Sequence, residues 1–120
     1  MRAIQENFIV ILRMELKDLS QDLEQLIIEC EKGHKDGHYS ANIFLQNMAT
    51  FRNELLGLNS FEHILDELQP ESYDSLELMI QDIRSKFHHL VDSHGLVHAV
   101  KIYIDRKLDK VATYFQRTNG

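Results

Sequence analysis

The chain is poor in residues that interrupt helices or cross-link a fold. Its 120 residues include one proline, five glycines, one cysteine and no tryptophan. A single cysteine excludes an intramolecular disulfide, so we expect Cys30 to be a free thiol in a reducing, cytoplasmic compartment. No apolar run approaches the ~18 residues that a membrane-spanning helix needs. The N-terminal apolar run stops at Arg13, unlike a secretory signal, so we expect no membrane partner.

Clustered positive charge is also scarce. The chain carries 19 acidic and 13 basic residues, a formal net charge of −6 with histidine neutral. Nucleic-acid binding needs clustered lysine and arginine, so nucleic acid is not an expected partner. The segment 96–120 is the exception, with five basic residues against two acidic ones. We expect this segment to pair with acidic helices beside it.

The chain is rich in long helical patterns instead. Residues 2–32 contain no glycine or proline, and their apolar residues recur at alternating spacings of three and four. This pattern predicts one helix about 45 Å long, at 1.5 Å rise per residue. The seam of this helix consists of Ile9, Leu12, Leu16, Leu19, Leu23, Leu26 and Cys30.

Three further helices follow in the sequence pattern. Gly33 and Gly37 mark the first turn, with Gly33 as the helix C-cap and Ser40 as the next N-cap. The second helix is predicted over 41–56, with Phe44, Met48, Phe51, Leu55 and Leu58 on its seam and Ile43 widening it. Gly57 is predicted to end or kink this helix. A capping box from Asn59 to Glu62 then predicts a short extra helix over 60–68, so that the second helix is broken.

Pro70 marks the next boundary. The third and fourth helices are predicted over 72–93 and 96–117, with Gly95 between them. No segment alternates with period two, so no strand is expected. The fold class is therefore all-α. We predict one domain, 1–120, folded as an antiparallel up-down-up-down four-helix bundle with a long first helix and a broken second helix.

Two surfaces are candidates for protein contact. Residues 8–12 are apolar without interruption, which a one-sided amphipathic helix does not need. Either several helices surround this end within the monomer, or a homodimer forms through Phe8, Val10 and Ile11. The second candidate surface is the basic outer face of the last helix. It comprises Arg106, Lys107 and Lys110.

The seven histidines raise the possibility of a metal site. His63 with Glu67, and His94 with His98, have the spacing that places two ligands one helical turn apart. Their order resembles the hemerythrin pattern, which implies a di-iron site within a four-helix bundle. The chain departs from that family because residues 1–33 contain no histidine and none follows His98. His94 and His98 also flank Gly95.

Arg84 and His89 are separated by four residues. This R-x4-H pattern resembles the signature of HEPN-domain ribonucleases, which are helical bundles that act as dimers. The resemblance implies that Arg84 would hold phosphate and His89 would take part in the 2′-hydroxyl chemistry. A guanidinium beside an imidazole suits a phosphodiester transition state. The pattern covers two residues, and Ser85 stands where a larger polar residue is usual.

No phosphate-binding loop, nucleophile motif or cofactor motif occurs in the sequence. The leading hypothesis is a non-enzymatic helical bundle that acts through contacts with a protein partner that the sequence does not identify. A HEPN-like ribonuclease and a metal-binding bundle are the alternatives. No cofactor is expected.

Overall fold

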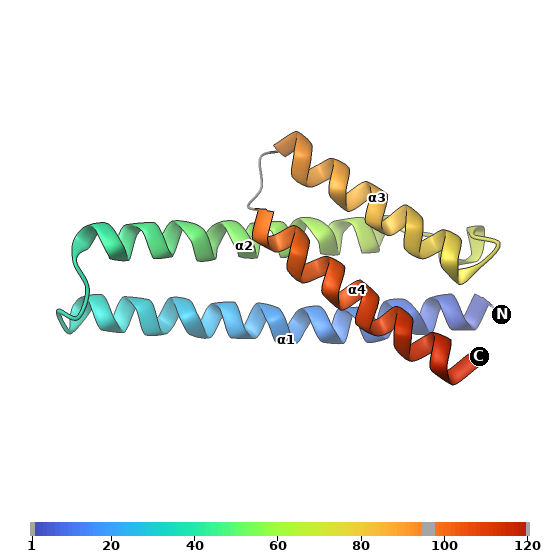
Figure 1. Ribbon diagram of the computed structural model, residues 1–120, viewed down its shortest axis with the longest axis horizontal. Helices are drawn as coiled ribbons and strands as arrows, with labels where there is room; N and C mark the ends of the chain where they lie inside the picture. The colour runs from blue at the N-terminus through green and yellow to red at the C-terminus, as the bar shows by residue number, and fades with distance from the viewer. Residues whose placement is uncertain (1, 95–97, 120) are drawn as a thin grey trace.

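The computed structural model describes residues 2–94 and 98–119, which form four α-helices and one short 3-10 helix. The α-helices are α1 (Arg2–Lys35), α2 (Ala41–Glu67), α3 (Leu76–His94) and α4 (His98–Asn119), with η1 (Pro70–Ser72) between α2 and α3. In Figure 1, α1 and α3 run towards the left, whereas α2 and α4 run back towards the right. The predicted all-α four-helix bundle is confirmed. No described helix is long and apolar enough to cross a bilayer.

The turn after α1 differs from its prediction. The helix continues through Gly33 to Lys35, and Gly37 takes the left-handed conformation with a φ of 78°. The His38 amide donates to the Gly33 carbonyl at 2.8 Å and the Gly37 amide to the His34 carbonyl at 3.1 Å. This pattern is a Schellman cap with Gly37 as its glycine. Ser40 caps α2 as predicted, since its side chain accepts from the Ile43 amide.

The predicted break in the second helix is wrong. Helix α2 is continuous over 27 residues, and Asn59 lies inside it. Gly57 is buried at the crossing with α4, where a Cβ atom would lie 2.6 Å from Val100 Cγ1. The glycine therefore permits the close approach of two helices and does not end one.

Helix α3 begins at Leu76, later than predicted, because Pro70–Ser72 form η1 and Ser75 provides the cap. The Ser75 hydroxyl accepts from the Leu78 amide at 3.2 Å. The buried Gln5 side chain ties this connection to α1, since its Nε2 donates to the Pro70 and Tyr73 carbonyls at 2.9 Å each. The predicted start of the fourth helix at residue 96 lies outside the described residues.

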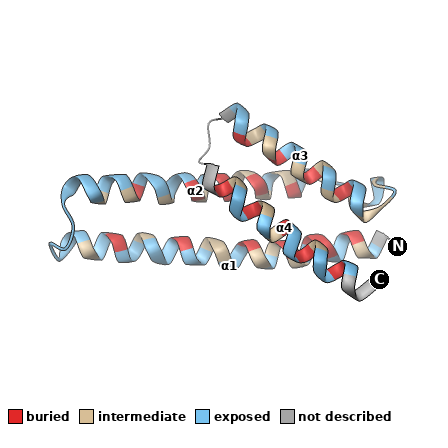
Figure 2. Cartoon of the chain, viewed as in Figure 1, coloured by how far each residue is buried: buried red, intermediate tan, exposed pale blue. Residues whose placement is uncertain are grey.

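The helices form two layers of unequal length. Helices α1 and α2 lie side by side, and α3 and α4 cover them only at the end that holds the start of α1 and the end of α2 (Figure 1). Buried residues concentrate at that end (Figure 2). The fully buried side chains come from all four helices and are Phe8, Leu12, Leu16, Phe61, Met79, Ile83, Phe87, Val100, Ile104, Leu108 and Val111.

The uncovered part of the first layer is named the arm, and consists of residues 20–35 and 41–56. It makes the molecule elongated, with principal extents of 55 × 29 × 19 Å. The radius of gyration of 16.8 Å exceeds the ~13.6 Å typical of a domain of this length. The arm begins where α4 begins, at the contact between Gly57 and Val100.

The crossing at Gly57 predicts an unusual response to alanine. In a helix interior alanine is normally about 1 kcal/mol more favourable than glycine. Here the added methyl group overlaps Val100, and overpacking costs about 1–3 kcal/mol. We expect Gly57→Ala to lower the free energy of unfolding in urea by about 1 kcal/mol.

Combining Gly57→Ala with Val100→Ala is the control for this prediction. The double variant should lose less stability than the sum of the two single changes, because the smaller side chain makes room for the methyl group. A Gly57→Ala protein more stable than the parent would contradict the assigned role of this glycine.

Candidate functional site

The apolar start of α1 is covered from within the monomer. Phe8 has no exposed surface, and its ring centroid lies 5.6 Å from that of Phe115 on α4. Ile11 is half-buried against the core, whereas Val10 is exposed. Of the three residues predicted for a dimer contact, only Val10 therefore lies mainly at the surface. Phe8 belongs to the intramolecular core.

The basic residues of α4 are used largely within the chain. Lys107 Nζ and Lys110 Nζ each lie 2.8 Å from the Glu15 carboxylate of α1. Hydrogen bonds from Lys107 and then Lys110 hold the pKa of Glu15 below its usual value, although partial burial opposes them. Arg106 is exposed. The predicted pairing of basic and acidic helices is present here, so two of the three proposed basic contact residues serve to attach α4 to α1.

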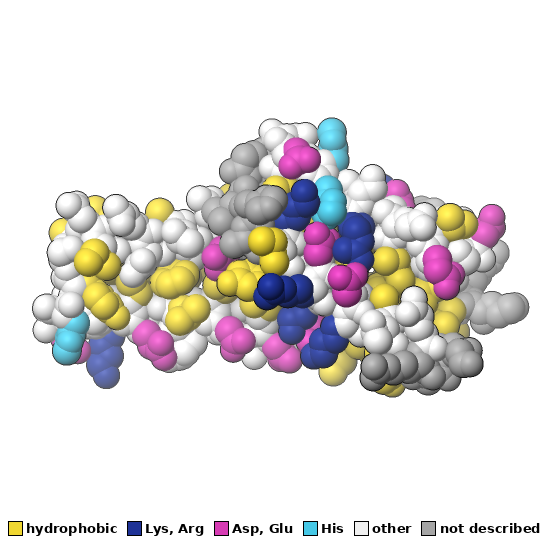
Figure 3. All heavy atoms as spheres, in the orientation of Figure 1, with side chains coloured by type: hydrophobic (Ala, Val, Ile, Leu, Met, Phe, Trp, Pro, Cys, Tyr) yellow, Lys and Arg dark blue, Asp and Glu magenta, His cyan; other side chains and the backbone are white. Residues whose placement is uncertain are grey.

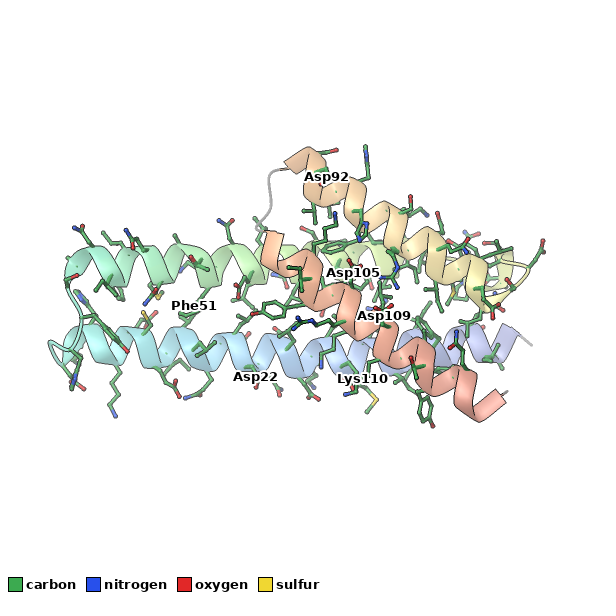
Figure 4. All side chains as sticks on the ribbon, viewed as in Figure 1. Asp22, Phe51, Asp92, Asp105, Asp109 and Lys110 are labelled. Carbon is green, nitrogen blue, oxygen red and sulfur yellow. The ribbon has the colours of Figure 1, made fainter. Side chains whose placement is uncertain are left out.

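A second polar cluster joins α3 to α4. Arg84 Nη1 lies 3.0 Å from Asp105 Oδ1, and Arg84 Nη2 lies 2.7 Å from Asp109 Oδ1. His88 Nε2 lies 2.9 Å from both oxygens of Asp105. Figure 4 shows these two aspartates on α4, on the part that faces α3. The carboxylates neutralise the guanidinium, so the cluster as it stands is an interhelical ion-pair network.

The structure does not join Arg84 to His89 in this cluster. His88 follows Arg84 by about one helical turn, so the two side chains lie on the same face of α3. His89 is the next residue and lies about 100° farther around the helix axis, on a different face. His89 is exposed, and its ring nitrogen lies 3.5 Å from Ser93 Oγ. The cluster thus contains the neighbouring histidine, and the ribonuclease interpretation stays a prediction without geometric support from His89.

The predicted metal ligands are not brought together in the described part of the chain. His63 and Glu67 are exposed on α2, and the side chains of His94 and His98 lie outside the described part of the structure. Among the described residues, no group of three or more histidine, cysteine, aspartate or glutamate side chains could hold a metal ion.

The surface that sequence reasoning missed is on the arm. Leu26 lies about five helical turns after Phe8, and Ile43 lies about five turns before Phe61, so each pair shares one line along its helix. Phe8 and Phe61 are fully buried, whereas Leu26 is 43% and Ile43 49% exposed. The difference arises because α4 covers Phe8, α3 places Phe87 against Phe61, and neither helix reaches the arm.

Two half-buried residues complete this surface: Phe51 of the arm and Leu19, which immediately precedes the arm on α1. The surface is named the arm face and consists of Leu19, Leu26, Ile43 and Phe51. Leu19 follows Glu15 by one turn and continues the side of α1 that meets α4. Phe51 lies between α1 and α2 (Figure 4). In Figure 3, hydrophobic side chains gather over the arm along the junction of α1 and α2, on the same side of the molecule as α4.

The sequence contained a signal for this surface in the helix lengths. The sequence pattern places Leu26 and Phe51 on apolar seams, and Ile43 widens the seam of the second helix. An apolar seam is buried only along the length that a neighbouring helix covers. The predicted third and fourth helices, 72–93 and 96–117, are shorter than the predicted first helix, 2–32. That difference in length indicated an uncovered seam.

Glu54 lies at the end of the arm that adjoins the covered half. It lies about one turn before Gly57, and its exposed fraction is 8%. Burial raises the pKa of this carboxyl group, because desolvation disfavours the charged form.

Comparisons with known proteins give no relative for this chain: no protein-family model, no curated protein and no solved structure matches it.

Replacing glutamate by glutamine is expected to have opposite effects on stability at Glu15 and at Glu54 at pH 7. The pKa of Glu15 is lowered in the folded state, so its charge stabilises the fold above the unfolded pKa of about 4.3. We expect Glu15→Gln to reduce the free energy of unfolding by about 0.5–1 kcal/mol at pH 7. The pKa of Glu54 is raised, so Glu54→Gln should increase stability at pH 7.

Urea unfolding of the parent and the two variants between pH 3 and pH 7 measures both effects. The loss in Glu15→Gln should disappear as the pH falls through the folded-state pKa of Glu15. The gain in Glu54→Gln should shrink as the parent's Glu54 becomes protonated. Differences that do not change with pH would contradict these electrostatic assignments.

Proposed function

We propose that this chain is a non-enzymatic helical protein that acts through protein–protein contacts, with the arm face as its contact surface. The single observation that carries the proposal is the exposure of Leu26 and Ile43 at helical positions whose equivalents, Phe8 and Phe61, form the core. A cytoplasmic location is part of the proposal and suits the buried free thiol of Cys30.

The shape of the arm face determines the kind of partner. It is the exposed side of a two-helix layer, and the same layer is covered by helices α3 and α4 farther along (Figure 1). A two-helix layer is stable when other secondary structure covers its apolar face. A contiguous exposed apolar surface commonly marks an interaction site. The expected partner surface is therefore also formed by amphipathic helices.

The polar residues support a contact function over catalysis. Arg84 and His88 bind carboxylates of α4, and Lys107 binds Glu15. These side chains join one helix to another, which is a sufficient reason for their presence.

A comparison of three full-length tagged proteins tests the proposal in cells that naturally express the chain. The first is the parent, the second carries Leu26→Asp with Ile43→Asp, and the third carries Met14→Asp with Leu45→Asp. Met14 and Leu45 are 63% and 62% exposed and lie on other sides of α1 and α2 than the arm face. The third protein gains two aspartates as the second does, so it controls for the change in charge.

Proteins that co-purify with the parent, including untagged copies of the chain itself, are quantified by mass spectrometry. We expect the Leu26→Asp/Ile43→Asp protein to lose its specific partners by about tenfold or more, as hot-spot residues do. The Met14→Asp/Leu45→Asp protein should retain them. Equal partner recovery by all three proteins would refute the arm face as the contact surface.

A further inference from the structure

We infer that the partner of the arm face is a second copy of this chain, with two arms packed face to face and antiparallel. The two arms would form a central four-helix segment between two outer bundle ends. The inference rests on the proposed function, because it assigns an occupant to the same surface.

The amount of exposed surface supports a dimer. The accessible area of the chain is 7672 Å², whereas a monomer of 14.1 kDa typically exposes about 6,700 Å². The excess of about 970 Å² is of the same order as the ~800 Å² that each partner buries in a standard protein interface. The chain thus exposes about as much additional surface as one dimer contact would remove.

The position of the second layer determines the orientation of the two copies. The arm spans about 16 residues of each helix, or about 24 Å. With parallel arms, α3 and α4 of both copies would lie at the same end of the dimer, between the two first layers. They would meet each other there and hold the arm faces apart. With antiparallel arms, the outer bundle ends lie at opposite extremes. Each arm then occupies the space beyond the other copy's second layer.

The arm face is also suited to a two-fold axis. A two-fold contact is formed by the same patch on both subunits. Leu26 lies near the middle of residues 20–35, so an axis through the centre of the arm brings Leu26 close to its own copy. An apolar side chain can form such a contact with itself, and Leu26 is 43% exposed in the monomer.

The charges beside the arm face give this dimer a distinctive salt dependence. Asp22 and Glu29 are exposed, and each follows a leucine of the arm face by three residues on α1. Acidic side chains flank the hydrophobic band along α1 in Figure 3. Antiparallel arms bring α1 near α1 of the second copy, so like charges approach one another. Salt should therefore strengthen this dimer, whereas it would weaken a complex with a basic partner helix.

The first experiment measures the solution mass of the purified full chain by light scattering at concentrations up to ~100 μM. We expect a mass of twice 14.1 kDa, and a dissociation constant that decreases when salt rises from ~50 mM to ~500 mM. Leu26→Asp with Ile43→Asp should weaken the dimer by about 100-fold or more. Met14→Asp with Leu45→Asp should leave it unchanged.

A cysteine variant tests the placement of the axis without a charge in the contact. In a Cys30→Ala background, Leu26→Cys should give a disulfide-linked dimer on mild oxidation, and Met14→Cys should not. Circular dichroism of each variant checks that the helices are retained. A chain that is monomeric at every concentration and salt level would overturn the inference. A dimer linked through position 14 and not through position 26 would overturn it as well.

Failure of this inference can be separated from failure of the proposed function. If the purified chain is monomeric, yet only Leu26→Asp with Ile43→Asp loses co-purifying proteins, the second copy is excluded and the contact function stands. If the matched control loses the same proteins to the same extent, the arm face itself is excluded.

Discussion

The difference in length between the two helical layers is the constraint on which the structure depends. Helices α1 and α2 have 34 and 27 residues, whereas α3 and α4 have 19 and 22. An apolar helix face is stable where another element covers it. The second layer therefore divides the first into a covered half with a core and an arm with an exposed apolar face. Equivalent helical positions hold Phe8 in the core and Leu26 at the surface.

The end of the second layer is fixed by packing, and polar contacts then orient it. Val100 rests against Gly57, where a side chain on α2 would not fit. Glu15 binds two lysines of α4, and Arg84 binds two aspartates of the same helix. Partly exposed ion pairs such as these contribute about 0.2–1 kcal/mol each. Burial of the shared core provides the larger driving force, and the ion pairs select the rotation of α4 about its axis.

The same contacts explain why residues that suggest chemistry need not perform it. Arg84 and His89, an arginine and a histidine separated by four residues, resemble a catalytic site in the sequence. In the fold, Asp105 binds both Arg84 and His88 and thereby joins α3 to α4. The uncovered apolar surface lies elsewhere, on the arm, and it carries the proposed contact and the proposed dimer. Glu54 lies at the end of the arm that adjoins the covered half.

The sequence by itself determined that the chain forms four main helices and in which order they follow. Continuous three-four spacing specifies α1, and Ser40 specifies the start of α2, because these signals act within a few residues of the chain. Tertiary structure alone decided the role of Gly57, which reads locally as a helix break but is required by Val100 on another helix. Tertiary structure also decided that Leu26 is exposed and that His88, not His89, joins Arg84. These outcomes depend on which helix lies opposite and where it ends, and periodicity along one helix carries no information about either.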